Sequence, residues 1–282
     1  MGTLASKSLA RPATAQGRST TQLRVMTYNI RLDTPVDGPD RWTYRRAGVG
    51  AQIDWFRPDI FGQQEVVFNQ KQDMIADLPD YRLIGAGRDD GHNAGESSPI
   101  GYRAALFDLL DSGTFWLSPT PDRPSKGWDA AFPRVATWAR LRIRSGGNTV
   151  LAVNTHWDHI GVEARKQSGL LLARWLSEHR GKTDHIILIG DFNSDLGSDG
   201  LRALTESGTG LRDSRNASQS KPFGPVGTFN NFKLQPEAHE TIDHILVGAK
   251  LLVVRYAVIA QNVDGRMLSD HYPVLADLQL GG

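Results

Sequence analysis

Residues 186–193 of this 282-residue chain read Ile-Ile-Leu-Ile-Gly-Asp-Phe-Asn. Four consecutive aliphatic residues predict a strand that is buried on both faces. Asp191 and Asn193 follow at positions i and i+2, so in an extended segment their side chains share a face. Polar groups just beyond the carboxyl end of a buried strand often bind a ligand. A simple Asp/Asn turn after a core strand explains this octet equally well, so the interpretation depends on the other strand ends.

The order of the predicted elements indicates the fold class. Helices are expected over residues 42–56, 69–78 and 162–179 and near 199–206. Strands are expected over residues 23–30, 59–65, 81–85, 100–107, 109–117, 135–144, 149–157, 186–189, 241–248, 251–260 and 272–280. Many of these strands pair as hairpins, and helices fall between strands in both halves. This pattern predicts an α/β (α+β) protein, a four-layer α/β/β/α sandwich of two mostly antiparallel sheets.

Length and composition describe an ordinary globular chain. Hydrophobic residues make up 39% and charged residues 22%, and the net charge is +1. Such a balance gives no broad basic field for binding long DNA. We expect residues 1–22 to be a disordered tail or a processed leader, with Ala13-Thr14-Ala15 as a small-residue cleavage site. Residues 23–282 are expected to form a single domain, cytoplasmic or exported after loss of the leader.

Several absences narrow the possible chemistry. The chain has no cysteine, which excludes disulfides, thiol nucleophiles and cysteine-ligated metals. No apolar run reaches the roughly 18 residues of a membrane span. Motifs of a serine nucleophile elbow, a Gly-Lys phosphate loop and a two-histidine metal helix are also missing. No obligate protein partner is indicated.

Unusual polar groups recur at the predicted strand ends. They are Asn29, Glu65, His156, Asp191 with Asn193, Asp243, and Asp270 with His271. Each has a structural explanation when considered alone, but their joint occurrence indicates a shared site. Carboxylate and amide oxygens suit Mg²⁺ or Mn²⁺, and histidines can carry protons. An oxygen-ligated divalent ion beside Asp, Asn and His is typical of phosphate-ester hydrolysis.

Six motifs carry a resemblance to a known family. They are residues 27–30 (Thr-Tyr-Asn-Ile), 62–66 (Gly-Gln-Gln-Glu-Val), 154–159 (Asn-Thr-His-Trp-Asp-His), 190–193 (Gly-Asp-Phe-Asn), 242–245 (Ile-Asp-His-Ile) and 269–274 (Ser-Asp-His-Tyr-Pro-Val). In this order they resemble the endonuclease/exonuclease/phosphatase superfamily, the relatives of deoxyribonuclease I. Residues 154–165 are similar to a bacterial branch near the RNA deadenylases and sphingomyelinases.

The resemblance implies a metal centre at one mouth of the sandwich. Glu65 would be the main carboxylate ligand of Mg²⁺ or Mn²⁺, and Asn29 would support it. Asp270 would lie beside the ion as a direct or water-mediated ligand. A metal-independent site in which Glu65 only braces its neighbours stays open.

The same resemblance implies the catalytic roles. Asp191 would orient and deprotonate the attacking water, and Asn193 would help to hold the water or the phosphate. His271, paired with Asp243, and His156 would bind the phosphoryl oxygens and offset their developing charge. One of these histidines would also protonate the leaving group.

The chain departs from the family's nucleases at two points. Many of them place an acid two residues after the first Asn, where this chain has Arg31, and apurinic endonucleases carry a Lys soon after the metal Glu, where Val66-Val67 follow here. Both departures argue against specialised DNA repair. Asp158 and His159 are interpreted as structural.

Substrate-binding candidates are fewer. Arg134 suits a phosphate, although it could equally fix its loop through carbonyl contacts. Trp157 could stack on a base or sugar, with burial in the core as the alternative, and Asn230 lies in a segment that lines the site in family members.

These observations predict a divalent-metal-dependent phosphoesterase that hydrolyses its substrate by in-line attack of water. The substrate would be a phosphorylated small molecule or a short nucleic acid. The preferred hypothesis is a nuclease-like phosphodiesterase or a hydrolase of small phosphate esters. A phosphomonoesterase acting on sugar or nucleotide phosphates, or a catalytically silent binding protein on the same fold, is the alternative.

Overall fold

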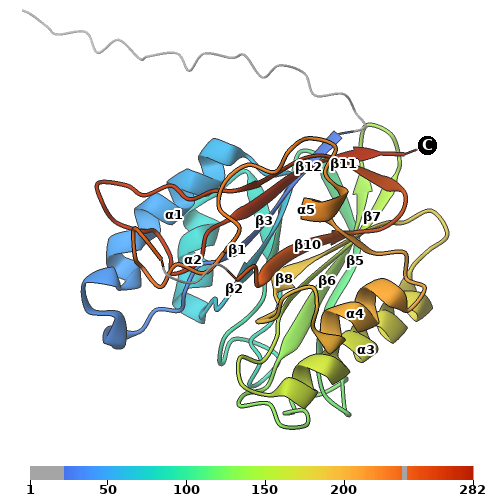
Figure 1. The fold of residues 1–282 in the computed structure, drawn as a ribbon, viewed down its shortest axis with the longest axis horizontal. Coiled ribbons are helices and arrows are strands. Elements are labelled where there is room, and N and C mark those ends of the chain that lie inside the picture. Colours follow the sequence, from blue (N-terminus) through green and yellow to red (C-terminus); the bar gives the residue numbers. More distant parts are fainter. Residues whose placement is uncertain (1–21, 237–239, 282) are drawn as a thin grey trace, which may run out of the picture.

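Two six-stranded sheets packed face to face form the centre of the molecule. The computed structural model describes residues 22–236 and 240–281. Helices cover the outer face of each sheet, so the molecule has four layers (Figure 1). The predicted fold class is confirmed. The tail predicted over residues 1–22 lies outside the described residues, except for Gln22, which begins the first strand.

The first sheet holds both ends of the described chain. Its strand order is β11 (Leu251–Val258), β12 (Val274–Leu280), β1 (Gln22–Asn29), β2 (Ile60–Gln64), β4 (Ile100–Arg103) and β3 (Tyr81–Ile84). Strands β1 and β2 are parallel, and the other neighbours are antiparallel. The carboxyl ends of β1 and β2 therefore meet the amino end of β12 at one edge.

The second sheet contains the aliphatic run that opened the sequence analysis. Its strand order is β5 (Phe107–Trp116), β6 (Val135–Ile143), β7 (Thr149–His156), β8 (His185–Asp191), β10 (Asp243–Val247) and β9 (Arg212–Asp213). Strands β7 and β8 are parallel, and the remaining pairs are antiparallel, including the predicted β6–β7 hairpin. The carboxyl ends of β7 and β8 thus lie beside the amino end of β10.

Helices on the two outer faces bury apolar side chains against the sheets. The 3-10 helix η1 (Pro35–Asp40) leads into α1 (Trp42–Phe56), which covers the first sheet together with α2 (Phe68–Asp77). Helices α3 (Val162–His179) and α4 (Asp199–Glu206) cover the second sheet. The short α5 (Ser214–Ala217) lies beside β11. Among the described helices, none combines the length and apolar character needed to cross a membrane.

The two sheets approach closely next to the strand ends that carry polar residues. A Cβ atom at Gly62 on β2 would lie only 2.5 Å from Cγ of Asn154 on β7, so a larger residue would force the sheets apart. Asn154 donates hydrogen bonds to the carbonyl oxygens of Gln63 and Pro99, both at 2.8 Å, and accepts one from Gln64 at 2.7 Å. Since these bonds are buried, they hold the two sheets in a fixed relation.

The last strand begins later than its sequence suggested. Residues 272–280 were expected to be extended, but β12 starts at Val274. Residues 269–273 instead form a loop in which His271 bridges to Phe229 of the long connection between α5 and β10. This loop directs its polar side chains to the edge where the other strand ends meet.

Candidate active site

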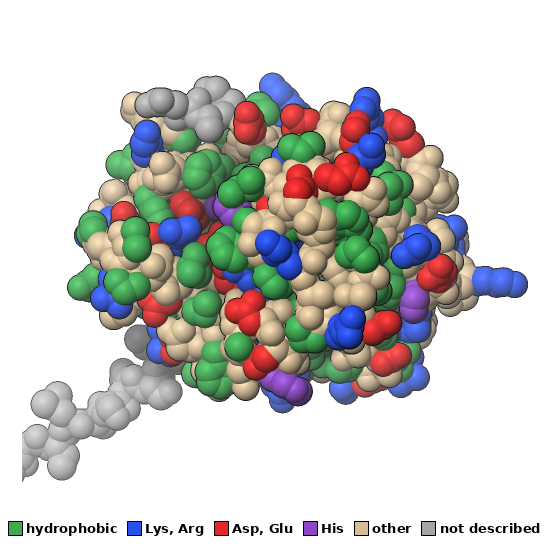
Figure 2. Space-filling model, turned by 90° about the horizontal axis from the view of Figure 1, so that it is seen from below, with side chains coloured by type: hydrophobic (Ala, Val, Ile, Leu, Met, Phe, Trp, Pro, Cys, Tyr) green, Lys and Arg blue, Asp and Glu red, His purple; other side chains and the backbone are tan. Residues whose placement is uncertain are grey.

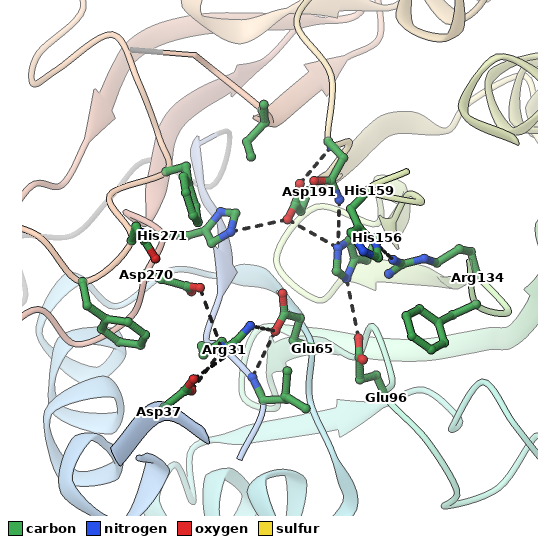
Figure 3. Close-up of a pocket in the computed structure, with 17 residues that line it drawn as sticks. Arg31, Asp37, Glu65, Glu96, Arg134, His156, His159, Asp191, Asp270 and His271 are labelled. Atoms are coloured by element: carbon green, nitrogen blue, oxygen red, sulfur yellow. Dashed lines mark hydrogen bonds and ion pairs between the residues drawn. The ribbon is translucent and has the colours of Figure 1, made fainter. Parts of the chain in front are cut away.

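The polar strand ends converge on one cavity of about 640 Å³ (Figure 3). Residues that were predicted for the site and line this cavity are Glu65, Arg134, His156, Asp191, Asn193, Asp270 and His271. Asn29 and Asp243 lie directly behind it, bonded to lining residues. The reason is topological: parallel strands end at the same edge, and the antiparallel strands beside them begin there.

Glu65 and Asp270 form the acidic side of the cavity. Glu65 follows β2 and accepts hydrogen bonds from the Asn29 amide at 3.0 Å and from the Leu32 backbone at 3.2 Å. Burial of the Asp270 carboxyl raises its pKa, and the nearby charge of Glu65 adds to this effect while His271 opposes it. Two carboxylates close enough to raise a pKa favour a bound cation. Their hard oxygen donors fit Mg²⁺ or Mn²⁺.

Asn29 connects the two sheets. Its amide nitrogen donates to Glu65 at 3.0 Å and to Asp191 at 2.9 Å, and its oxygen accepts the backbone N–H of Arg31 at 3.0 Å. In this orientation Asn29 positions the two carboxylates and does not turn its oxygen toward them. Its role as a metal ligand stays a prediction.

A second acidic cluster lies beside the first. Ligand atoms of Asp191, Asp243 and His271 all lie within 4.8 Å of one another, a spacing that could also hold an ion. However, Asp243 is fully buried and already pairs with His271 at 2.9 Å. Glu65 and Asp270, on the more open side of the cavity, offer a second set of carboxylate oxygens that could hold an ion.

Asp191 stands at the end of β8 with the features of a base. Its carboxylate accepts the Asn193 backbone N–H at 2.9 Å and lies 3.5 Å from His156 Nε2 and 3.7 Å from His271 Nε2. Burial and the negative charge of Asp243 raise the pKa of Asp191 to about 7, against the opposing charge of His271. A base with a pKa near neutrality can both accept and release a proton at ordinary pH.

Two of the three histidines that line the cavity, His156 and His271, have pKa shifts in opposite directions. Burial disfavours the imidazolium of His271, but the charges of Asp243 and Asp191 outweigh it and hold the pKa of His271 well above its usual value. Burial, together with the positive charges of Arg134 and Arg88, holds the pKa of His156 well below its usual value. These shifts favour the imidazolium form of His271 and the neutral form of His156. Opposite shifts of this kind separate the roles of neighbouring groups.

Five residues that line the cavity have left-handed backbones, two of them Asn231 and Phe232 with φ values of 51° and 59°. The others, Arg31, Glu65 and Asn193, have φ values of 58°, 61° and 46°. For a residue with a Cβ atom this conformation costs roughly 1–2 kcal/mol, and it persists only where neighbouring contacts enforce it. Strain of this kind is concentrated where side chains must be aimed at a ligand.

One predicted substrate-binding residue is wrong. Trp157 is fully buried and packs edge-on against Phe192, with ring centroids 4.8 Å apart, so it cannot stack on a substrate.

Asn230 is also buried, and its amide atoms have no hydrogen-bond partner among the described residues. Its backbone N–H donates to the carbonyl oxygen of Asp270 at 2.7 Å. A substrate contact by Asn230 stays a prediction.

Arg134 lies across the cavity from the acidic side. Its Nε donates to Asp158 at 3.2 Å, and its Nη2 lies 3.0 Å from His159 Nδ1. Asp158 is structural, as expected, because it also accepts backbone N–H groups from Ala131 and Gly161. His159, interpreted as structural from the sequence, instead lines the cavity.

The wall of the cavity next to Arg134 contains an aromatic side chain, Phe132, that was not predicted from the sequence. The ring of Phe132 is 47% exposed and lies nearly parallel to His159, with Arg88 packed against it at 4.8 Å. Arg88 also forms an ion pair with Glu96 at 2.8 Å, and burial raises the pKa of Glu96. Glu96 belongs to the polar, glycine-rich segment 87–98, and that composition was the one available signal for it.

The outer surface carries mixed charge. On the face shown in Figure 2, acidic and basic side chains alternate with hydrophobic ones, and no wide patch of a single sign is visible. This distribution agrees with the net charge of +1. This face therefore offers a charged ligand no broad field of a single sign.

Comparison with known proteins agrees with the six motifs. A family model described as the Endonuclease/Exonuclease/phosphatase family matches residues 26–271. An endonuclease/exonuclease/phosphatase from Bacteroides vulgatus is 42% identical, covers 92% of this chain and 99% of its own, and superimposes with a TM-score of 0.88. A mannosyl-6-phosphatase from Bacteroides thetaiotaomicron is 39% identical over 91% and 99% of the two chains, with a TM-score of 0.87. The human Nocturnin catalytic domain, 21% identical over 92% of this chain and 94% of its own, shares the fold with a TM-score of 0.71.

Proposed function

This chain belongs to the endonuclease/exonuclease/phosphatase family, and from that premise we propose that it is a divalent-metal-dependent phosphomonoesterase acting on sugar phosphates. One observation carries the proposal. A single cavity brings together an oxygen donor set for a cation, a carboxylate whose pKa is raised to about 7, and a histidine whose pKa is held well above its usual value. Each of these three groups assists the hydrolysis of a phosphate ester, by offsetting charge or by activating water.

The metal would be held by Glu65 and Asp270. When bound, Mg²⁺ or Mn²⁺ polarises the phosphoryl group and offsets its charge. Asp191 accepts the proton of the attacking water, while Asn193 at the same strand end orients that water. His271 donates a hydrogen bond from Nε2 to a phosphoryl oxygen, because its Nδ1 is already bonded to Asp243. Charge that develops in the transition state thus meets groups that are already in place.

His156 has a different role because it is neutral. Its Nε2 lies 3.1 Å from the amide nitrogen of Asn193, which implies that Nε2 accepts and that the ring proton is on Nδ1. Nδ1 lies 3.8 Å from Glu96. We assign His156 to holding Asn193 in position and to a hydrogen bond with the substrate.

Two observations support a sugar phosphate as substrate. The similar Bacteroides thetaiotaomicron protein is a mannosyl-6-phosphatase. In this chain the wall opposite Glu65 joins an exposed aromatic ring, Phe132, to the charged groups of Arg134 and Glu96. The exposed part of the Phe132 ring can contact the apolar surface of a sugar, and the polar atoms of Arg134 and Glu96 that their protein partners leave free can bond hydroxyls. A cavity of about 640 Å³ is of a size suited to a small ligand.

The decisive experiment is a substrate panel with Mg²⁺, Mn²⁺ or EDTA. It compares mannose 6-phosphate, glucose 6-phosphate and AMP with a diester, bis(p-nitrophenyl) phosphate, and a short RNA. We expect metal-dependent release of phosphate from the hexose phosphates, lost in Asp191→Asn. A diester or RNA cleaved faster than every monoester would replace the proposal with the nuclease-like reading. Turnover that survives both EDTA and Asp191→Asn would show that the site is wrong.

A further inference from the structure

Arg31 occupies the position where many nucleases of the family carry an acid, and the structure gives it an unusual setting. It lies in the loop between β1 and η1 with a left-handed backbone. The backbone is fixed on both sides of its Cα atom. Its N–H donates to Asn29 at 3.0 Å, and its carbonyl oxygen accepts from Gln70 at 2.8 Å and from Arg45 at 3.2 Å. These contacts from three elements hold the side chain toward the cavity.

The side chain is fixed by one carboxylate. Arg31 donates through Nε and Nη2 to the two oxygens of Asp37, at 3.0 and 2.9 Å. A bidentate pair of this kind fixes the plane of the guanidinium group. The remaining terminal nitrogen, Nη1, lies 3.6 Å from Glu65, and Nε lies 3.9 Å from Asp270 (Figure 3). Arg31 thus presents part of a fixed cation between the two carboxylates assigned to the metal.

Charge explains what this cation can recognise. A phosphate monoester is mostly dianionic at neutral pH, since its second pKa is about 6, and it has three terminal oxygens. A diester is a monoanion with two terminal oxygens. A metal held by Glu65 and Asp270 would bind one terminal oxygen of the phosphate, and His271 would bind a second. A third cationic donor therefore finds a free terminal oxygen only in a monoester. Arginine suits this task because it stays charged and forms directional bonds to phosphate.

We propose that Arg31, held by Asp37, binds a terminal phosphoryl oxygen and selects monoester dianions over diesters. This inference rests on the proposed phosphoesterase function and adds the residue that sets its substrate class. The other arginine lining the cavity, Arg134, lies on the opposite wall, where it pairs with Asp158 and faces the rest of the substrate. Arg31 would therefore bind the phosphoryl group of the substrate, and Arg134 would face its sugar.

The test compares a monoester and a diester with the same leaving group. Arg31→Gln removes the charge, and Arg31→Lys keeps the charge without the bidentate geometry. With p-nitrophenyl phosphate, Arg31→Gln should lower kcat/KM by about 10-fold to 100-fold, the effect of one charged hydrogen bond. With bis(p-nitrophenyl) phosphate the loss should be less than about threefold. Arg31→Lys should recover part of the monoester activity.

A matched control is available in α1. Arg46 forms the same bidentate pair with Asp77, at 2.8 and 2.8 Å, but does not line the cavity. Arg46→Gln should leave the ratio of monoester to diester activity unchanged. Equal loss on both substrates in Arg31→Gln, or the same change in Arg46→Gln, would overturn the proposal.

A binding measurement separates this inference from the proposed function. Affinity for inorganic phosphate is measured by calorimetry on the metal-free protein and again with Mg²⁺, and Mn²⁺ affinity is measured separately. Arg31→Gln should weaken phosphate binding about tenfold or more in both states and leave Mn²⁺ affinity without a comparable loss. Unchanged phosphate affinity would refute the role of Arg31 even if the enzyme is active. A wild-type protein that binds phosphate through Arg31 but hydrolyses nothing in the panel would refute the proposed function alone.

Discussion

Removal of one buried charge should shift the pH dependence of this protein. Asp243 is fully buried and accepts a hydrogen bond from His271 Nδ1 at 2.9 Å. Asp243→Asn keeps the size of the side chain and removes its charge. A hydrogen bond to a charged group contributes about 1.5–3 kcal/mol, which corresponds to about 1–2 pKa units for His271.

The direction of the shift follows from the charge of the active form. In the wild type, the charges of Asp243 and Asp191 hold the pKa of His271 well above its usual value, despite the opposing effect of burial. Without the Asp243 charge the pKa of His271 falls, so the proton is lost at lower pH. The alkaline limb of kcat/KM should therefore move down by about 1–2 pH units. The acid limb should also move to lower pH, because the Asp243 charge that raises the pKa of Asp191 is lost as well.

The assay is a pH profile of kcat/KM with saturating Mg²⁺, together with an NMR titration of the His271 ring. A close control exists at the next residue, because His244 pairs with Asp213 at 3.2 Å in a buried site that does not line the cavity. Asp213→Asn should lower stability without moving the alkaline limb. If Asp243→Asn leaves the limb in place, or if both variants move it equally, the charge pairing described here does not control the reaction.

Three further predictions concern the metal, the base and the core. Glu65→Gln should lower Mn²⁺ affinity at least about tenfold by calorimetry, since it removes a charged ligand; an unchanged affinity would place the ion elsewhere. Because the pKa of Asp191 is raised from 3.8 to about 7, the folded metal-free protein binds a proton more tightly than the unfolded chain. The contribution of Asp191 to stability should therefore fall as pH rises from 3.8 to about 7, and Asp191→Asn should flatten this part of the urea-unfolding profile. Trp157→Ala should lower the free energy of unfolding by about 3–5 kcal/mol, and a loss below about 1 kcal/mol would contradict its place in the core.

Much of the site could be predicted because the strands specify it. The carboxyl ends of parallel strands meet at one edge, so Glu65, His156 and Asp191 follow from locating the strands. The family resemblance added the pairing of His271 with Asp243, which the structure confirms at 2.9 Å. Helix α1 was also predicted with its observed bounds, because Pro58 follows it and ends the apolar pattern.

The burial of Trp157, which was predicted to contact the substrate, could have been inferred from the alternation of side chains along a strand. His156 faces the cavity, and neighbouring residues of an extended chain face opposite sides. Trp157 therefore points into the layer beneath α3, as Phe192 does after Asp191. The wall residues Phe132 and Glu96 lie in loops, where no periodicity relates a residue number to a direction. Their positions depend on contacts with Arg88, which is distant in sequence from Phe132.

The two halves of the site belong to different sheets. The distance between the sheets therefore affects the rate of the reaction. Glu65 follows β2 and Asp191 ends β8, so the separation of cation and base is an inter-sheet distance. The close contact of Gly62 with Asn154 sets the distance between the sheets near the site. Interiors hardly compress, and a shift of about 1 Å in reacting groups can cost about 100-fold in rate. Natural selection for turnover therefore acts on apolar residues that no substrate touches, and homologous chains should vary less between the sheets than beneath the helices.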